Sequence, residues 1–379
     1  MVSVEERVLL LLSIKESGRY IKFDHIKEKI ARDVLFFDHK NISAEEIQSA
    51  ISRLVNLGLI EQGEDGYAMT DAGEKEVSNV ILKDNKGLNL SYLMTWKAKR
   101  YYPKAGEFML PYLKGRAVSV IKVFSGKSDP IQSVETLFVR YKKYKPKPVP
   151  IVIDNQDQLM DYVNDHCVDF IPYVNSLGHD QPDYLILDLD AGDALKASET
   201  GFSTIKAVTE SITQLLDDTG VNYIVKFSGS RGFQIWGALD NKDPILLSKP
   251  DIFAFYRLIA MRVRDFVEKD LEQERSWIEK YGVEEVEWPI TTSTVAKKEE
   301  RSKQVLLDWS SMKPNGDARA PYSLHYKTGL VSLPISSKSI YQFKREYSDP
   351  EYLLKFGITS FPPPVPSPPT LLLKKIGLI

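Results

Sequence analysis

Residues 182–190 have the sequence Pro-Asp-Tyr-Leu-Ile-Leu-Asp-Leu-Asp, an apolar run that ends in two aspartates, Asp188 and Asp190. Side chains alternate between the faces of a β-strand, so a strand here would direct both aspartates to one face and Leu189 to the other. Carboxylates on one face repel each other unless a cation or a proton lies between them. The stretch therefore predicts either a cation site or a strand end that faces water.

A second apolar run, Val305-Leu306-Leu307, also ends in a carboxylate, that of Asp308. A third carboxylate from a distant strand would complete an oxygen cage, and Mg²⁺ and Mn²⁺ prefer oxygen ligands. We therefore expect Asp188, Asp190 and Asp308 to hold a divalent metal and to form the catalytic centre.

The composition is that of an ordinary soluble protein, and 379 residues are enough for two or three domains. The single cysteine, Cys167, excludes an internal disulfide framework and a cysteine-rich zinc site, and it favours a reducing compartment such as the cytoplasm. The apolar run 8–12 is too short to span a membrane, so we expect no signal peptide and no membrane anchor.

Residues 1–80 have the pattern of a winged helix. Helices are predicted over 5–15 and 23–31, and a third after the capping box at 43–46, followed by a hairpin that turns at Asp65-Gly66. Residues 1–77 contain 10 Lys/Arg and 15 Asp/Glu, whereas DNA affinity depends largely on cations that contact phosphate. The module is therefore predicted either to contact DNA or to have a structural or protein-docking role.

The opposite charge balance follows, with 13 Lys/Arg and three acidic residues between Trp96 and Pro148. Cations neutralise phosphates and tyrosine rings stack on bases, so a basic strip interleaved with Tyr101, Tyr102, Tyr141 and Tyr144 favours a nucleic-acid strand over a solvated basic face. The residues predicted to contact DNA are Lys97, Lys99, Arg100, Lys104, Arg140, Lys142 and Lys143, with Lys145 and Lys147 in the same second cluster.

After Asp190 the pattern is a helix from Ser203 that stops at Gly220, a strand over 221–227, and a turn rich in serine and glycine at 228–234. Such a turn presents backbone amides to an anion, and Arg231 adds charge for a triphosphate, although serine–glycine turns are often only turns. Residues 251–281 are predicted to be a helical insertion.

A strand is also predicted over 320–330, where His325 and Lys327 would share one face and meet phosphate oxygens. The alternative is a structural histidine. Beyond residue 345, prolines at 362–364 and 368–369 precede the apolar end 371–379. This tail is predicted to be an extended linker carrying a peptide that docks on the body or binds a protein partner.

Several of these stretches resemble the archaeo-eukaryotic primase superfamily, most closely the polymerase domain of bacterial ligase D. The resemblance runs from residue 101 to about residue 334, and its most specific motifs are 182–190, 226–229, 307–310 and 321–324. It implies a catalytic domain over 90–345 with mixed sheets flanked by helices, between the winged helix and the tail 346–379.

The resemblance also implies the site. The three aspartates would bind two divalent metals, Mn²⁺ or Mg²⁺, and the partners would be a DNA template and primer together with nucleoside triphosphates. The resemblance implies nucleotide binding by Ser228, Arg231, Gly232 and Arg301. We also predict nucleotide contacts for Lys226 in the motif 226–229, for Gln234 in the same turn, and for His325 and Lys327.

The chain departs from this family at several positions. Gln234 stands where a histidine is usual, and 171–173 replace a histidine before Pro-Trp. His325 replaces an arginine, and the run from Ser323 to Leu330 is more similar to small subunits of archaeal replicative primases. The cysteine zinc module of those subunits is absent, so we expect no structural zinc.

These features predict a primase-polymerase that adds nucleotides to DNA in end joining or gap filling. One alternative is a replicative primase subunit that makes primers de novo. The other is a non-catalytic winged-helix protein that binds DNA or acts as a scaffold, which retention of all three aspartates argues against.

Overall fold

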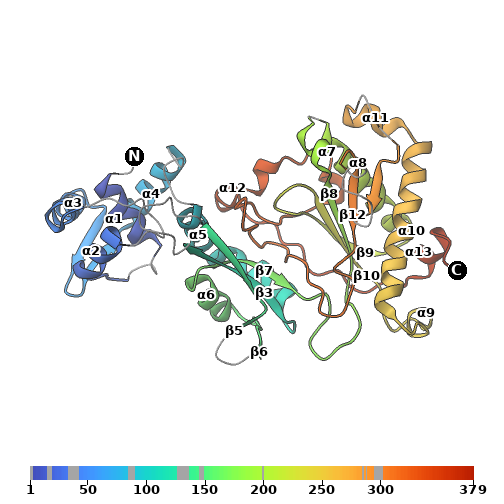
Figure 1. Cartoon of the computed structure of the whole chain (residues 1–379), viewed down its shortest axis with the longest axis horizontal. Coiled ribbons are helices and arrows are strands. Elements are labelled where there is room, and N and C mark those ends of the chain that lie inside the picture. The colour runs from blue at the N-terminus through green and yellow to red at the C-terminus, as the bar shows by residue number, and fades with distance from the viewer. Residues whose placement is uncertain are drawn as a thin grey trace. The chain divides into compact units, whose positions relative to one another are not determined.

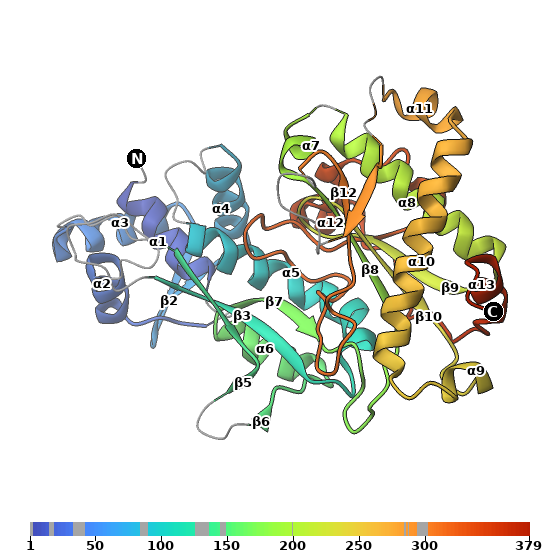
Figure 2. The same cartoon turned by 45° about the vertical axis from the view of Figure 1, so that its right-hand side comes forward.

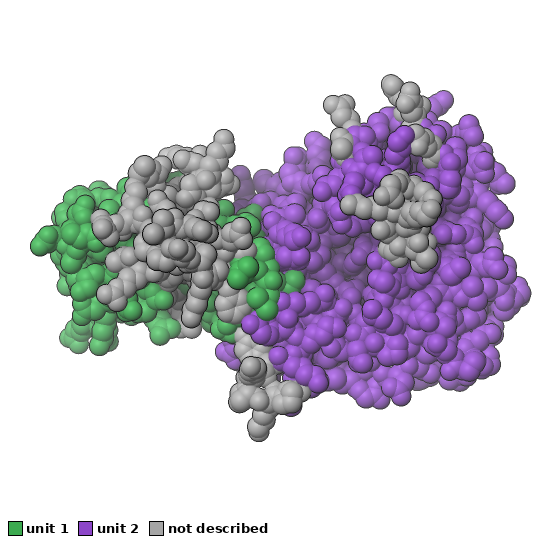
Figure 3. Space-filling view, in the orientation of Figure 1, with its two compact units in different colours: residues 1–100, 121–139, 162–168 green, residues 101–120, 140–161, 169–379 purple. Residues whose placement is uncertain are grey.

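The computed structural model describes residues 3–14, 19–32, 42–83, 90–125, 136–144, 149–198, 200–283, 286, 288–293 and 302–379. The chain divides into two compact units, which Figure 3 colours separately. The first comprises 1–100, 121–139 and 162–168, and the second comprises 101–120, 140–161 and 169–379. Residues 346–379, expected to form a separate tail, therefore belong to the second unit.

The first unit contains short helices and a hairpin, as predicted. The first and third helices each begin at a capping box, formed by Ser3 with Glu6 and by Ser43 with Glu46. Gly63 pairs with Gly66, so the hairpin turns one residue earlier than expected. The elements are α1 (Val4–Ser13), α2 (Phe23–Arg32), α3 (Ala44–Asn56), β1 (Ile60–Gly63), β2 (Gly66–Met69) and α4 (Asp71–Lys83).

Helix α1 lies at the centre of this unit. Its residues 8–12 are nearly fully buried, and they share one apolar core with Ile47 and Ile51 of α3. Tyr92 and Trp96 from the start of α5 (Leu90–Leu113) belong to the same core. The first unit therefore extends into this long helix.

The second unit is built on a six-stranded mixed sheet in the order β11-β12-β8-β10-β9-β13. Figures 1 and 2 label β8, β9, β10 and β12 of this sheet. Neighbouring strands are antiparallel except β11 and β12, which are parallel. The strands are β8 (Leu185–Ala191), β9 (Asn222–Phe227), β10 (Phe233–Ala238), β11 (Thr291–Ser293), β12 (Val305–Asp308) and β13 (Pro334–Ile335).

Two long helices cover this sheet. Helix α8 (Gly201–Asp218) places Ile205, Ile212 and Leu216 at helical spacing, all of them buried, and contacts β8, β9, β10 and β12. Helix α10 (Ile252–Gln273) packs on α8 and is followed by α11 (Ser276–Tyr281). The predicted strand–helix–strand pattern and the helical segment 251–281 are confirmed.

The remaining elements are short. A three-stranded sheet has the order β4-β3-β7, and a two-stranded sheet pairs β5 with β6. Their bounds, with those of the other helices, are β3 (Val118–Ser125), β4 (Thr136–Tyr141), β5 (Lys143–Tyr144), β6 (Val149–Pro150), α6 (Gln156–Asn164), β7 (Cys167–Pro172), α7 (Asp193–Ala197), α9 (Pro244–Leu247), η2 (Ser337–Ser339), η3 (Arg345–Ser348), α12 (Pro350–Phe356) and α13 (Thr370–Lys375).

The proline-rich tail docks on the body of the second unit. Ser367 forms a parallel bridge to Leu239, and the Phe361 amide donates to the hydroxyl of Tyr322 at 2.7 Å. Leu372 in α13 is fully buried. The tail therefore docks on the body, as one of its two predicted roles requires, although Val365 and Leu371 remain exposed. Partner binding by the tail stays a prediction.

Across the portion of the chain that the structure describes, no helix is both long enough and apolar enough to cross a membrane.

Candidate active site

Four polar residues form one row across the centre of the six-stranded sheet. Asp308 of β12 is the register partner of Asp188 on β8, which is in turn opposite Gln234 on β10, and Gln234 is opposite Lys226 on β9. Directly opposed residues on neighbouring strands project to the same face. Asp190, two residues beyond Asp188, shares that face. The sheet thus brings the three predicted aspartates to adjacent positions.

Burial and mutual repulsion disfavour the charged form of the two β8 aspartates. Burial raises the pKa of Asp188 to about 7, with Asp190 and Asp308 adding to the shift and Gln234 and Lys226 opposing it. Burial also raises the pKa of Asp190, against the opposing charge of Arg231, whose Nη2 lies 2.6 Å from Asp190 Oδ2. The site therefore favours a positive charge beside these carboxylates.

The carboxylate oxygens of the three aspartates are the ligands that a hard divalent cation prefers, but the side chains are not arranged around one metal position. Asp308 is oriented by Ser310, whose amide and hydroxyl donate to it at 2.7 and 3.1 Å. Arg231 occupies one oxygen of Asp190. Among the described residues, no group of three or more His, Cys, Asp or Glu side chains is arranged to hold a metal ion. Arg231 would therefore compete with a metal ion for this oxygen of Asp190.

Gln234 contacts an aspartate. Its Nε2 donates to Asp188 Oδ2 at 2.9 Å, and its Oε1 accepts from Trp236 Nε1 at 3.3 Å. The residue is only 6% exposed. Both polar ends are therefore engaged within the sheet, where the contact with Asp188 orients that carboxylate. The nucleotide contact expected of Gln234 stays a prediction.

Lys226 is fully buried, which does not suit the direct nucleotide contact expected of it. Its Nζ donates to Ser332 Oγ at 2.7 Å and lies 5.5 Å from the centre of the Trp236 ring. Burial, followed by the charge of Arg319, lowers its pKa to about 7. Lys226 therefore influences the site electrostatically, because its positive charge opposes the rise in the pKa of Asp188.

The predicted serine–glycine turn joins β9 to β10 and packs tightly against β8. The Ser228 amide donates to the Gly232 carbonyl at 2.9 Å, and Gly229 has a φ of 82°. A Cβ on Gly232 would lie 1.7 Å from the Leu189 carbonyl oxygen, so only glycine fits there. The turn is therefore held beside the strand that carries the two aspartates.

The prediction of a strand over 320–330 is wrong, because the backbone forms turns there. Tyr322 has a φ of 68°, and the amides of His325 and Gly329 close a tight turn with the carbonyls of Leu330 and His325, both at 2.8 Å. His325 is buried whereas Lys327 is exposed, so the two side chains do not share a face.

The imidazole of His325 is held neutral and in one tautomer. Its Nδ1 accepts from the amides of Lys327 and Thr328 at 3.3 Å, which leaves the proton on Nε2. Burial, then the charges of Arg319, Lys327 and Arg231, lowers its pKa to about 3. At neutral pH the ring is a neutral hydrogen-bond donor through Nε2.

The His325 loop touches the serine–glycine turn. Thr328 Oγ1 donates to the Gly229 carbonyl at 2.5 Å, and a Cβ on Gly229 would lie 2.9 Å from the His325 Cβ. Two stretches that the sequence suggested separately for phosphate binding are therefore adjacent.

The predicted basic strip is divided between the two units. Lys97, Lys99 and Arg100 belong to the first unit, where Arg100 pairs with Glu74 at 3.3 Å. The remaining predicted DNA contacts lie in the second unit and are exposed: Lys104, Arg140, Lys142 and Lys143. Arg301, Lys145 and Lys147 lie outside the described residues.

Some side chains of the strip are already engaged. Arg140 forms an ion pair with Asp317, and Lys142 lies 3.9 Å from the same carboxylate. Tyr101 and Tyr102 are fully buried, so the prediction that they stack on bases is wrong. Both residues lie on a buried face of α5, so their rings pack inside the protein.

Sequence reasoning missed a buried ion pair close to the turn. Asp169 on β7 is fully buried and pairs with Arg319 at 2.9 Å, and Arg319 Nη1 donates to the Ser228 carbonyl at 3.1 Å. A carboxylate inside the apolar run Cys167–Pro172 was the signal that could have revealed Asp169. The sequence around Arg319 carries no comparable signal.

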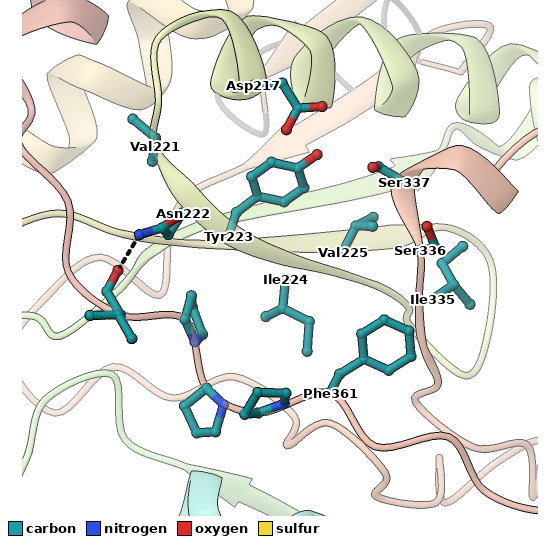
Figure 4. Close-up of a pocket in the computed structure, with 14 residues that line it drawn as sticks. Asp217, Val221, Asn222, Tyr223, Ile224, Val225, Ile335, Ser336, Ser337 and Phe361 are labelled. Atoms are coloured by element: carbon teal, nitrogen blue, oxygen red, sulfur yellow. Dashed lines mark hydrogen bonds between the residues drawn. The ribbon is translucent and has the colours of Figure 1, made fainter.

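A cavity of about 520 Å³ lies elsewhere in the second unit, and none of the predicted site residues lines it. Figure 4 shows that β9 lines one side of the cavity, with Ser336 and Ser337, and with Phe361 of the docked tail, on the others. The side chain of Asn222 donates a hydrogen bond to the Val365 carbonyl of the tail. The cavity thus reflects how the tail packs and does not mark the row of carboxylates.

Comparisons with known proteins identify the family of this chain. A family model described as the LigD primase-polymerase domain matches residues 97–349. A solved structure of the polymerase domain from Mycobacterium tuberculosis ligase D in complex with DNA is similar, with 19% identity, a TM-score of 0.49, and coverage of 68% of this chain and 88% of that chain. A comparison with curated protein sequences finds no match. Because the family model covers more than half of the chain, this protein belongs to the LigD primase-polymerase family and is a nucleotidyltransferase.

Proposed function

We propose that this protein is a template-directed primase-polymerase that adds nucleotides to DNA in gap filling or end joining. The observation that carries the proposal is the row Asp308–Asp188 in one sheet, beside a turn that packs against β8. Carboxylates and an anion-binding turn at one site are what transfer of a nucleotide from a triphosphate requires, because the protein contributes mainly position and charge.

Asp188, Asp190 and Asp308 would hold two divalent ions, Mg²⁺ or Mn²⁺. Such ions, when bound, lower the pKa of the attacking 3′-hydroxyl and neutralise the departing pyrophosphate. Gln234 would keep Asp188 oriented through its 2.9 Å hydrogen bond. Arg231 would transfer from Asp190 to the triphosphate, where its planar fork can pair with two phosphate oxygens.

The triphosphate would lie against the turn that begins at Ser228 and Gly229. His325 would donate from Nε2, and the exposed ammonium of Lys327 would pair with phosphate oxygens. The contact of Thr328 with Gly229 supports this arrangement, because it keeps the loop and the turn adjacent.

DNA would be held by the exposed cations of the second unit and by the cluster on α5. Three helices followed by a hairpin in the first unit support a winged helix. Its excess of acidic residues favours a protein partner, or contact with only a few phosphates, over broad DNA binding.

Extension of a labelled primer across a gapped template, with Mn²⁺ and beside an unprimed template, tests the proposed function. We expect template-directed addition to the primer at the gap. Products on the unprimed template would instead indicate a replicative primase. DNA binding without addition on either template would indicate a non-catalytic scaffold.

A further inference from the structure

Asp169 is a charged residue in a fully buried strand position. It lies in β7 among apolar residues and has no solvent exposure, so its charge must be compensated within the protein. Arg319 supplies that compensation: its Nε lies 3.0 Å from both carboxylate oxygens, and its Nη2 lies 2.9 Å from Oδ2. The side chain of Arg319 is only 14% exposed.

The other edge of the Arg319 guanidinium contacts the serine–glycine turn. Nη1 donates to the carbonyl oxygen of Ser228 at 3.1 Å. Because the guanidinium is planar and rigid, binding Asp169 with one edge fixes the direction in which Nη1 points. One side chain therefore ties the turn to β7.

Asp169 also holds the loop that carries His325. Its Oδ2 accepts from the Tyr326 amide at 3.3 Å, and its Oδ1 accepts from Ser323 Oγ at 3.2 Å. Tyr326 lies between His325 and Lys327 in the chain. The carboxylate and its arginine thus connect both segments for which triphosphate binding is proposed.

We propose that Asp169 and Arg319 are positioning residues that fix the Ser228 turn and the His325 loop in the geometry needed by the incoming nucleoside triphosphate. This inference rests on the proposed function. Neither residue belongs to the row of carboxylates on β8 and β12, so loss of their bridge should weaken nucleotide binding more than it slows the addition step.

Arg319→Lys is the most informative variant. Lysine keeps the positive charge that Asp169 requires, but a single ammonium cannot pair with that carboxylate in a fork and also reach the Ser228 carbonyl. We expect the KM for the nucleotide to rise about tenfold, as for loss of a charge-assisted contact, while kcat stays within about twofold. The affinity for a labelled deoxynucleoside triphosphate with Mn²⁺, measured without primer, should fall by the same factor.

Arg116→Lys is a matched control in the same unit. Arg116 also spans a carboxylate and a main-chain carbonyl, with Asp183 at 2.7 Å and the Tyr173 oxygen at 3.1 Å, and its side chain is 8% exposed. It contacts neither the turn nor the His325 loop in these bonds. We expect Arg116→Lys to lower the thermal midpoint as Arg319→Lys does, without raising the KM for the nucleotide.

Asp169→Asn and the double variant complete the test. Because both residues act through one bridge, the double variant should raise the KM little more than either single change does. If Asp169→Asn fails to fold, the nucleotide KM of Arg319→Lys compared with that of Arg116→Lys still tests the positioning role.

The results separate the two proposals. Absence of primer extension by the unmodified protein overturns the proposed function, and nucleotide binding without primer then still tests the bridge. An unchanged KM and affinity in Arg319→Lys, an equal rise in Arg116→Lys, or fully multiplicative effects in the double variant would overturn the positioning role.

Discussion

At the scale of single residues, the site depends on what each carboxylate contacts. Asp188 receives a hydrogen bond from Gln234, Asp190 pairs with Arg231, and Asp308 is oriented by Ser310. Three different neighbours thus fix three side chains of the same type. Their roles can be separated experimentally, because each neighbour can be changed without touching an aspartate.

Gln234→Leu should slow nucleotide addition without weakening nucleotide binding. The change removes the donor to Asp188 and the acceptor for Trp236 Nε1, so the carboxylate loses its orientation. Groups that orient a metal ligand contribute about 10–100-fold to metal affinity or activity, so we expect kcat to fall by about that factor.

Steady-state kinetics at varied nucleotide and Mn²⁺ concentrations check this expectation. Gln214→Leu is the control, because Gln214 also donates to an aspartate, Asp218, but on the exposed side of α8. A rise in the nucleotide KM with unchanged kcat would mean that Gln234 faces the triphosphate after all.

His325 should make the protein less stable in acid. Its pKa is lowered to about 3 in the folded state, below the ordinary value of 6.5. The unfolded chain therefore binds the proton more readily, so the stability due to the neutral ring is complete above about pH 6.5 and is lost as the pH falls toward 3. His325→Asn lacks this titration.

We expect the free energy of unfolding to drop between pH 7 and pH 4 by about 3 kcal/mol more in the unmodified protein than in His325→Asn. Denaturant unfolding at both pH values gives the difference. His179→Asn, which alters an exposed histidine, should behave as the unmodified protein does. Equal pH dependence in all three proteins would show that the His325 ring is not held neutral.

At the scale of elements, predictions succeeded where the pattern of apolar residues matched one period. Helix α8 and strands β8 and β9 were predicted because their buried residues recur at helical or strand spacing. The segment 320–330 was mispredicted because His325 and Lys327 alternate as in a strand. The positive φ of Tyr322 and the turn closed at Gly329 depend on contacts with distant residues.

For the candidate site, too, the local features could be predicted from the sequence and the non-local ones could not. Three aspartates at strand ends and a serine–glycine turn are visible in the sequence, because each is a local departure from an apolar run. Their register across the sheet is not local, nor is the pairing of Asp169 with Arg319, residues 150 positions apart. Burial of Tyr101 and Tyr102 likewise depends on how α5 packs.

The basic cluster of the second unit should account for part of the salt dependence of DNA binding. Replacing Lys104, Lys142 and Lys143 by alanine removes exposed cations, and each lost phosphate contact lowers the slope of log affinity against log salt by about 0.9. We expect the slope to flatten by about 2, since Lys142 already lies near Asp317.

Binding of a labelled duplex at several salt concentrations measures this slope. The control replaces Lys338, Lys344 and Lys355, which are also exposed lysines of the second unit but lie outside the strip. Equal flattening in the control would show that binding responds to net charge alone.

At the scale of the whole molecule, the chain combines a family catalytic region with a segment that precedes it. The family match begins at residue 97, whereas the first compact unit includes residues 1–100. Residues 1–77, before the match, carry an excess of acidic residues, 15 against 10 Lys/Arg. The described residues of the predicted metal and nucleotide sites all lie in the second unit. We therefore propose nucleotide addition for the second unit and partner recognition for the first.

The central claim is that the row Asp308–Asp188 is the catalytic centre of a DNA nucleotidyltransferase. The most direct measurement is addition of one labelled nucleotide to a one-nucleotide gap, by the unmodified protein, Asp308→Ala and Asp218→Ala. We predict templated addition by the first and third proteins and none by Asp308→Ala, with equal DNA binding by all three. Addition by Asp308→Ala at the rate of the unmodified protein would contradict the account.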